Sequence, residues 1–339
     1  MSKIHLKIEN MWWLNEKPAL LFRAASQLYR VINHCNLKGR KRRSVAPPLP
    51  MISVGNLTVG GSGKTPFVIW LALLLKKSGL KPVIISRGDG GKSGVPQLLN
   101  DQSDPFTVGD EALLLYRKCD CPVIAGRDRI RASRMAAEYG DIIILDDGFQ
   151  YRQLKRSCDI VLIPAEGVGN NHLIPAGPLR EPLEALDRAD LIVRTGQPGE
   201  RQSDEHKSDE IKPLTTGKEW RWWSCEKQLV QLAGEKAEAP KRAVALTAIA
   251  RPQRFILSLE KLDIGIEEAC LFPDHHPFSE ADIRLATAHN LPVIVTAKDA
   301  VKLQNIWPAN QELWVLEQSA EAEAGLFEAI KTILDNAGA

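Results

Sequence analysis

A glycine-rich stretch near residue 60 has the composition of a loop that binds phosphate. It reads GNLTVGGSGKTP over residues 55–66, between the apolar run MISVG (51–55) and an apolar helical pattern. In such loops glycines let backbone N–H groups approach phosphate oxygens, the lysine reaches the β- and γ-phosphates, and the threonine hydroxyl ligates Mg²⁺. We therefore expect a nucleotide site, with Thr65 also at the metal, formed by Thr58, Val59, Gly60, Gly61, Ser62, Gly63, Lys64 and Thr65.

Thr58 departs from the usual phosphate-loop pattern, which has glycine five residues before the glycine of GKT. Threonine cannot adopt positive φ values cheaply, so we expect a different backbone shape where this loop begins. A plain glycine-rich turn at a helix start is the alternative. The Lys64–Thr65 ending directly after a strand favours the phosphate loop.

Two adjacent aspartates, Asp146 and Asp147, end the apolar run DIIILD (141–146) and its following turn. Ligands of open α/β sheets lie at the carboxyl ends of the strands, so these acids and the phosphate loop should share one edge. We expect them to hold or orient Mg²⁺. One of the two could instead cap the next segment.

Two further groups are ambiguous from their pattern alone. Asp110 and Glu111 precede a helical stretch, where the helix dipole alone would favour acids in the first turn. His275 and His276 lie in the loop sequence PDHHPFS (273–279). One of them could pair with a carboxylate across a cleft and gain basicity, but a structural or surface histidine fits the pattern as well.

Short β-branched runs alternate with helical patterns through the first two thirds of the chain. Because these runs are apolar almost throughout, they are typical of strands buried on both faces. Their alternation with helices predicts a P-loop NTPase-like α/β fold, a parallel sheet with helices on both faces. The runs are MISVG (51–55), PVIIS (82–86), PVIAG (122–126), DIIILD (141–146), DIVLIP (159–164) and DLIVRTG (190–196).

A polar stretch around residues 197–219 predicts a domain boundary. The runs WRWWS (220–224) and QLVQLAG (228–234) then predict two strands of a hairpin between the domains. Further strand-like runs predict a smaller α/β domain near the C-terminus. The expected organisation is an N-terminal helix and basic turn at 1–45, a phosphate-loop domain at 46–218, a hairpin linker at 219–234 and the smaller domain at 235–339.

The N-terminal segment has an apolar stripe at helical spacing, followed by a cluster of cations. A helix of this kind can lie in the headgroup region of an anionic membrane. It could equally pack on the core and end in a solvated basic turn. The stripe comprises Leu21, Ala25, Leu28 and Ile32 after Trp12 and Trp13, and the cations are Lys38, Arg40, Lys41, Arg42 and Arg43.

The composition restricts the class of protein further. Apolar residues make up 44% and charged residues 25% of the chain, as in soluble globular proteins. With 44 basic and 42 acidic side chains, the chain has no signature of a nucleic-acid partner. Six scattered cysteines fit reduced cytosolic thiols and no structural zinc. We expect neither a membrane span nor a signal peptide.

Several segments, in order and over nearly the whole chain, resemble the tetraacyldisaccharide 4′-kinases of lipid A biosynthesis. A GKT motif alone would be weak, whereas the ordered set is highly specific. The matching segments are SVGNLTVGGSGKTP (53–66), SRGDGGK (86–92), VGDE (108–111), GRDR (126–129), DDGFQ (146–150), PAGPLRE (175–181), ALTAIARPQRF (245–255), DHHPF (274–278) and KDAVKL (298–303).

This resemblance implies transfer of the γ-phosphate of ATP, with Mg²⁺, to the 4′-hydroxyl of a tetraacyldisaccharide 1-phosphate, which forms lipid IVA. It implies that Asp110 and His275 form a catalytic pair. It makes Asp146, Asp147 and, more weakly, Glu181 acids of the metal site. By the same resemblance the possible phosphate contacts of the substrate are Arg129 and Arg180.

The resemblance also implies a peripheral protein at the cytoplasmic face of the inner membrane, reaching its lipid through the N-terminal helix. We expect a monomer. Three residues depart from the family pattern: Asp89 replaces a tyrosine, Tyr151 a histidine and Ala297 a glutamate. Any role for those positions is therefore in doubt.

Two other classes of protein share a phosphate loop. The first is a GTPase or ATPase switch. A GTPase would need an NKxD motif to bind guanine, but TAKD (296–299) has its lysine one place late. A nucleotide-dependent ligase or amidase of similar fold is the second alternative.

Overall fold

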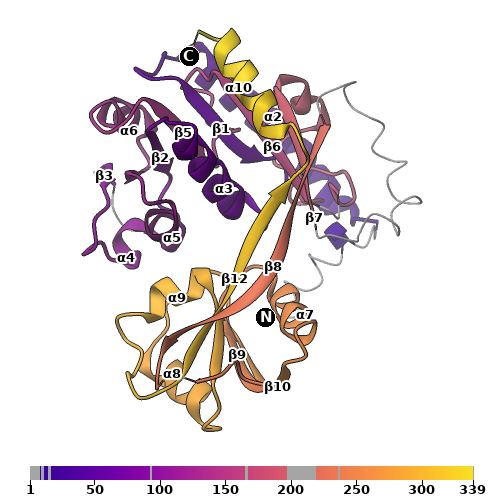
Figure 1. Ribbon diagram of the computed structural model, residues 1–339. Helices are drawn as coiled ribbons and strands as arrows, with labels where there is room; N and C mark the ends of the chain where they lie inside the picture. The colour runs from indigo at the N-terminus through magenta and orange to yellow at the C-terminus, as the bar shows by residue number, and fades with distance from the viewer. Residues whose placement is uncertain are drawn as a thin grey trace.

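The computed structural model describes residues 8, 11–13, 17–91, 94–164, 167–196, 219–235 and 237–338. Figure 1 shows two lobes joined by two long strands. The polar segment expected as a domain boundary lies, up to residue 218, outside the described residues. The larger, upper lobe carries the phosphate loop.

The upper lobe contains a mostly parallel sheet in the order β3-β4-β2-β5-β1-β6-β7, in which only β3 runs antiparallel to its neighbour. Every residue of β1, β2, β5 and β6 is buried, as expected for apolar strands covered on both faces. The strands are β1 (Met51–Asn56), β2 (Pro82–Ser86), β3 (Gln97–Leu98), β4 (Val123–Ala125), β5 (Ile142–Asp146), β6 (Cys158–Pro164) and β7 (Leu191–Gly196).

Helices cover both faces of this sheet, which confirms the predicted α/β class. On one face α3 (Lys64–Lys77) and α5 (Asp110–Cys119) share an apolar core, and the short helix α4 (Pro105–Val108) precedes α5. The other face carries α6 (Arg129–Ala136) and the 3₁₀ helix η1 (Leu183–Arg188). The N-terminal helix α2 (Leu20–Arg42) packs beside η1 through Tyr29.

The lower lobe continues the same sheet in the order β10-β9-β11-β12. Its helices α8 (Glu280–Thr287) and α9 (Ala297–Leu303) cover one face, and α7 (Pro252–Glu260) covers the other. This arrangement confirms the smaller α/β unit. Its strands are β9 (Arg242–Thr247), β10 (Gly265–Leu271), β11 (Val293–Thr296) and β12 (Leu313–Ala322).

The expected hairpin at 219–234 is wrong, because this segment forms one continuous strand, β8 (Glu219–Ala233). Its first residues pair with β7, and most of its length pairs antiparallel with β12, so the lobes are joined by two strands from distant parts of the chain. The physical reason lies in residues 225–228. These read CEKQ and offer no glycine, proline, asparagine or aspartate for a tight turn.

The chain also returns to the upper lobe after β12. Helix α10 (Leu326–Asn336) buries Leu326, Ile330 and Leu334 in the core that contains Ile52 of β1. The expected domain at 235–339 is therefore wrong at its C-terminal end. An amphipathic helix must bury its apolar stripe, and α10 does so on the upper sheet (Figure 1).

Gly55 of β1 shows how closely the upper core is packed. A Cβ atom at this position would lie 2.5 Å from Cβ and 2.7 Å from the backbone nitrogen of Phe149. We expect Gly55→Ala to lower the free energy of unfolding by about 1–3 kcal/mol, because the added methyl group overpacks the core. Urea denaturation measures this loss.

Gly94→Ala is the matched control, because a Cβ there would meet nothing within 4 Å. It should change the free energy of unfolding by less than about 0.5 kcal/mol. Equal stabilities of the two variants would contradict the close contact at Gly55.

Candidate active site

The phosphate loop follows β1, and its first residues pair with the segment 178–180. Thr58 is 2% exposed and forms a β-bridge with Leu179, while the Val59 N–H donates to the Pro178 carbonyl at 2.8 Å. A β-bridge uses extended backbone that any residue adopts. Threonine therefore fits at the position where the usual pattern has glycine.

The rest of the loop bends more sharply. Gly60 and Gly63 have φ of 103° and 77°, values that favour glycine, and Gly63 caps the start of α3. The Ser62 carbonyl accepts a hydrogen bond from the Thr195 hydroxyl of β7 at 3.0 Å. The backbone of the loop is thus fixed at both ends, with Lys64 in the first turn of the helix.

Asp147 lies among three cations. Its carboxylate is 3.3 Å from Lys64 Nζ and accepts from Arg180 Nη1 at 3.1 Å on both oxygens, while Arg129 donates to its carbonyl at 2.8 Å. Burial would raise the pKa of Asp147, but the charges of Lys64, Arg180 and Arg129 outweigh it and lower the pKa. This carboxylate stays ionised.

Asp146 has the opposite environment, although it is the neighbouring residue. It ends β5 and is buried, Oδ2 lies 3.4 Å from the Ser86 hydroxyl, and Oδ1 has no partner among the described residues. Burial, and then the negative charge of Glu111, raise the pKa of Asp146 to about 7, against the opposing charge of Lys64. An orphaned, buried carboxylate oxygen is a position that a cation would stabilise.

The donor set around Asp146 suits Mg²⁺ better than a metal held by protein alone. The described residues contain no group of three or more histidine, cysteine, aspartate or glutamate side chains placed to hold a metal ion. Mg²⁺ at phosphate-transfer sites needs only one or two protein carboxylates in addition to phosphates and water. The Asp146 carboxylate meets that requirement, and the phosphate-loop pattern adds the Thr65 hydroxyl as an oxygen ligand.

Glu181 does not belong to this set. Its side chain is buried, and its two oxygens form ion pairs with Arg152 at 2.5 Å and Arg188 at 3.2 Å. Because both oxygens are already paired with cations, we withdraw Glu181 from the metal-site candidates. The Arg188 guanidinium also stacks over the Phe149 ring at 4.3 Å, which marks this cluster as part of the core.

Asp110 and His275 meet across the two lobes. Asp110 begins α5, His275 lies on a loop of the lower lobe, and Nδ1 of the imidazole is 3.1 Å from both carboxylate oxygens. The hydrogen bond to Asp110 raises the pKa of His275 against burial. Burial would raise the pKa of Asp110, but the same bond and the charge of Lys298 lower it.

His276 points away from this contact. Its ring stacks on Phe272 with 4.6 Å between centroids, and Nε2 is 3.2 Å from Asp282 Oδ2. The structure therefore distinguishes two histidines that the local pattern left equivalent: His275 faces the upper lobe, and His276 packs within the lower lobe.

Sequence reasoning missed Lys298 and Arg251. Lys298 begins the KDAVKL segment and lies beside both Asp110 and His275. Arg251 reaches the phosphate loop, since a Cβ at Gly60 would lie 3.7 Å from its Nη2, and its guanidinium stacks over the Trp13 ring at 4.3 Å. Both residues fall in segments that carried the family resemblance, which was the available signal.

Helix α2 presents its polar side to the protein. The Ser26 hydroxyl donates to the Leu173 carbonyl at 2.9 Å, and Tyr29 Oη and Asn33 Nδ2 donate to the Arg180 carbonyl at 3.0 and 2.9 Å. Leu37 near its end is buried, but five other apolar residues face outward and are each 59–80% exposed: Leu20, Leu21, Leu28, Val31 and Ile32. In the described part of the chain, no helix combines the length and apolarity that crossing a bilayer requires.

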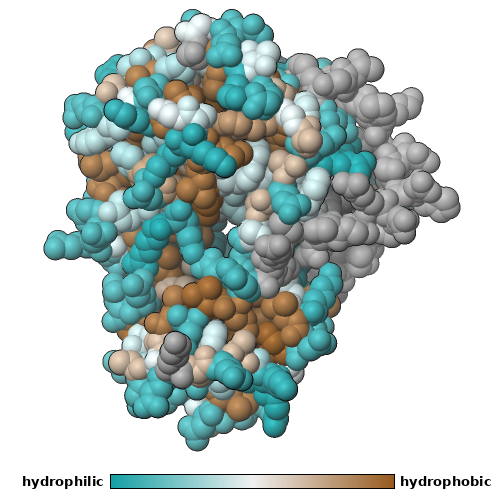
Figure 2. Space-filling model, viewed as in Figure 1, coloured by the Kyte–Doolittle hydropathy of each residue, from teal (hydrophilic) through white to brown (hydrophobic). Residues whose placement is uncertain are grey.

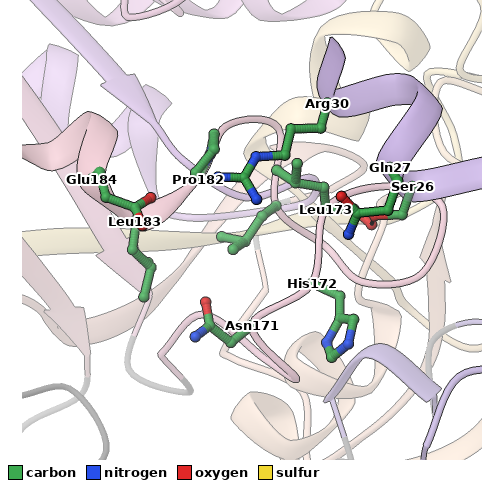
Figure 3. A pocket seen from close by; sticks show the side chains of 10 residues that line it. Ser26, Gln27, Arg30, Asn171, His172, Leu173, Pro182, Leu183 and Glu184 are labelled. Carbon is green, nitrogen blue, oxygen red and sulfur yellow. Dashed lines mark hydrogen bonds between the residues drawn. The ribbon is translucent and has the colours of Figure 1, made fainter. Parts of the chain in front are cut away.

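A pocket of about 290 Å³ lies between α2 and the segment 171–184 (Figure 3). Arg30 extends from the helix towards Pro182, with Asn171 and His172 on the other side of the opening. Leu179 lines the pocket and also pairs with Thr58, so the pocket borders the start of the phosphate loop. Its other lining residues are Ser26, Gln27, Leu173, Leu183 and Glu184.

A glycine-rich loop after β1, acids after β5 and a facing lobe that supplies a histidine are the features of a P-loop phosphotransferase. The model of the tetraacyldisaccharide-1-P 4′-kinase family matches residues 18–335, and the chain belongs to that family.

Individual relatives agree with the family match. The tetraacyldisaccharide 4′-kinase of Halorhodospira halophila is 38% identical over 292 residues, covering 85% of this chain and 84% of that protein. The one of Methylobacillus flagellatus is 37% identical over 344 residues, covering 95% and 94%. A crystal structure of the "apo" form of LpxK from Aquifex aeolicus in complex with ATP has a TM-score of 0.71 and 30% identity, covering 92% of this chain and 98% of that chain.

The unpaired oxygen of Asp146 predicts that its carboxylate destabilises the ligand-free fold. Asp146→Asn removes a buried charge, and we expect it to raise the free energy of unfolding of the ligand-free protein at pH 8 by about 1–3 kcal/mol. The gain should shrink as the pH falls below 7, because Asp146 is then protonated in the folded wild type.

Thermal unfolding at pH 8 and pH 5.5 measures the effect. Asp147→Asn is the matched control, because it removes an ionised carboxylate that three cations stabilise and should lower the stability at both pH values. A destabilised Asp146→Asn variant at pH 8 would show that the Asp146 carboxylate is not an uncompensated buried charge.

Proposed function

We propose that this chain transfers the γ-phosphate of ATP to the 4′-hydroxyl of a tetraacyldisaccharide 1-phosphate and thereby makes lipid IVA. The observation that carries the proposal is the Asp110–His275 contact, which assembles a proton acceptor from both lobes of a phosphate-loop protein. Membership of the 4′-kinase family and the ATP named for the Aquifex aeolicus structure support the substrates.

In the proposed reaction, the Asp110–His275 pair accepts the proton of the 4′-hydroxyl as its oxygen attacks the γ-phosphorus. The bond from the γ-phosphorus to the bridging oxygen breaks, and ADP leaves. Lys64 and the loop backbone bind the phosphates, and Arg129 and Arg180 add positive charge nearby. Asp146 and Thr65 would hold Mg²⁺, which when bound neutralises charge on the phosphate oxygens.

The acceptor would approach from the side of helix α2. The exposed apolar face of α2 can enter the acyl boundary of a membrane, and the basic residues 38–43 at its end can contact anionic headgroups. The pocket beside α2 then offers Arg30 and polar groups to part of the disaccharide. We infer a peripheral, monomeric enzyme at the cytoplasmic face of the inner membrane, where ATP is available.

An assay with γ-labelled ATP and the lipid disaccharide 1-phosphate tests the proposal. We expect the label in the lipid, at the 4′ position. Release of labelled phosphate with no labelled lipid would overturn the proposal and favour an ATPase or GTPase switch. Asp299 of TAKD does not suit guanine reading, because its side chain is buried and accepts from the Thr247 and Thr296 hydroxyls.

The proposed catalytic pair predicts coupled losses of activity. Asp110→Asn and His275→Gln should each lower kcat by about 10²–10⁴-fold. The double variant should lose less than the product of the two factors, because both side chains accept the same proton. Steady-state kinetics at saturating ATP measures the three variants.

His276→Gln is the control, since His276 packs within the lower lobe and should affect stability more than kcat. Fully multiplicative losses at Asp110 and His275 would show that the two residues act independently.

The outward face of α2 predicts the basis of membrane binding. Replacement of Leu21, Leu28 and Ile32 by serine should weaken binding to anionic phospholipid vesicles by more than about tenfold. The reason is that transfer of each leucine or isoleucine side chain from water into the membrane stabilises the bound state. The melting temperature should stay within a few degrees, since these side chains are exposed in the folded protein.

Vesicle co-sedimentation measures binding. Leu257→Ser and Leu285→Ser, at exposed positions of α7 and α8 in the lower lobe, provide the control. Equal vesicle binding by the α2 variant and the wild type would exclude α2 as the membrane contact.

A further inference from the structure

Lys298 of α9 places one ammonium group among side chains from both lobes. Its Nζ donates to Glu111 Oε1 at 3.1 Å and to Asp274 Oδ1 at 3.2 Å, and it lies 3.5 Å from His275 Nε2. Asp110 Oδ2 is 3.9 Å away. The side chain is only 16% exposed, so these contacts are shielded from water.

These distances restrict where the imidazole of His275 carries its proton. An ammonium group can donate hydrogen bonds but cannot accept them. A neutral imidazole in contact with Lys298 therefore keeps Nε2 as the acceptor and its proton on Nδ1, from where it is donated to Asp110. The Asp110–His275 pair then holds a single proton and can accept a second.

Lys298 also balances the charges around His275. The negative groups beside the imidazole are Asp110 from α5 and Asp274 from its own loop, while Glu111 of α5 pairs with Lys298 itself. A second lysine, Lys302, has its Nζ 4.0 Å from Asp110 Oδ2 and 2.9 Å from Asp299 Oδ1. Without Lys298, the carboxylates of Asp110 and Asp274 would therefore favour a doubly protonated, inactive imidazole.

The backbone of His275 is held by the Ala248 carbonyl, which lies 3.3 Å from its N–H, and by Asp274, which also contacts Lys298. His275 has φ of 60°, a left-handed conformation that costs a non-glycine residue about 1–2 kcal/mol. Its N–H lies 3.1 Å from Asp274 Oδ1, the oxygen that also accepts from Lys298. Lys298 thus connects the turn that carries His275 to Glu111 in the upper lobe.

We propose that Lys298 is a positioning residue for the Asp110–His275 pair: it fixes the Asp274–His275 turn against α5 and keeps His275 Nε2 free of a proton. This inference rests on the proposed kinase function for its kinetic consequence, but not for its effect on His275. The charge of Lys298 lowers the pKa of His275, so its removal should raise that pKa further.

Lys298→Met and Lys298→Arg test the proposal in the full-length protein. The first readout is the titration of His275 by NMR, with its signal assigned by its loss in His275→Gln. We expect the midpoint in Lys298→Met to rise by about 1 pH unit and the midpoint in Lys298→Arg to stay near that of the wild type.

The second readout is the pH profile of kcat/KM with ATP and the lipid acceptor. The acid limb should move upward with the His275 midpoint in Lys298→Met, because activity is lost as the pH falls through that pKa. Activity near pH 9 should approach that of the wild type. Lys118→Met is the matched control. It breaks another ion pair of α5, the one with Glu317 of β12 at 2.5 Å, without touching His275.

An unchanged His275 midpoint in Lys298→Met would overturn the inference, even if activity falls equally at every pH. The same midpoint shift in Lys118→Met would also overturn it, by showing that any loosening of the lobes suffices. If the wild type labels no lipid, the proposed function fails, while the NMR midpoint still decides the role of Lys298.

Discussion

The antiparallel pairing of β8 with β12 is the constraint on which the site depends. These two strands carry the chain out of the upper sheet and back again, so one set of hydrogen bonds fixes the lower lobe relative to the phosphate loop. Asp110 begins α5 and His275 lies on a loop of the lower lobe, 165 residues further along the chain. Their 3.1 Å contact exists because the sheet is continuous through both lobes (Figure 1). Figure 2 shows apolar side chains at the surface on both sides of the junction.

Within that frame the site separates charges that are adjacent in sequence. Asp147 turns into a left-handed conformation and meets Lys64, Arg129 and Arg180, whereas Asp146 stays in the strand with Oδ1 unpaired among the described residues. One carboxylate is thus neutralised by the protein, and the other is left for a ligand. A protein that binds a highly charged nucleotide gains from this difference, since the group that must be desolvated on binding is already out of water.

The sequence predicted what local patterns determine and missed what tertiary contacts decide. Apolar β-branched runs predicted the buried strands, and the order GKT, DDGFQ identified the edge of the sheet that carries the phosphate loop. The continuity of β8 was missed because two apolar pieces separated by polar residues look like a hairpin when the distant partner strand is unknown. The apolar residues of α10 predict that one face of the helix is buried, but they do not predict which lobe buries it. Pattern alone left His275 equivalent to His276, and only the family resemblance distinguished them. Nothing in the sequence revealed that both oxygens of Glu181 are taken by Arg152 and Arg188.

Over most of its length helix α2 has the reverse of the usual arrangement for a surface helix, because Ser26, Tyr29 and Asn33 face the protein whereas Leu20, Leu21 and Leu28 face outward. The two sides should therefore evolve under different rules. On the outer side any apolar residue would serve, so drift among leucine, isoleucine, valine and phenylalanine should be free there. On the inner side Tyr29 and Asn33 donate to the carbonyl of Arg180. The guanidinium of the same residue binds Asp147. Substitution of either residue would shift Arg180 and, through Asp147, the ion pair with Lys64 of the phosphate loop. Selection should therefore preserve the particular side chains at these two positions.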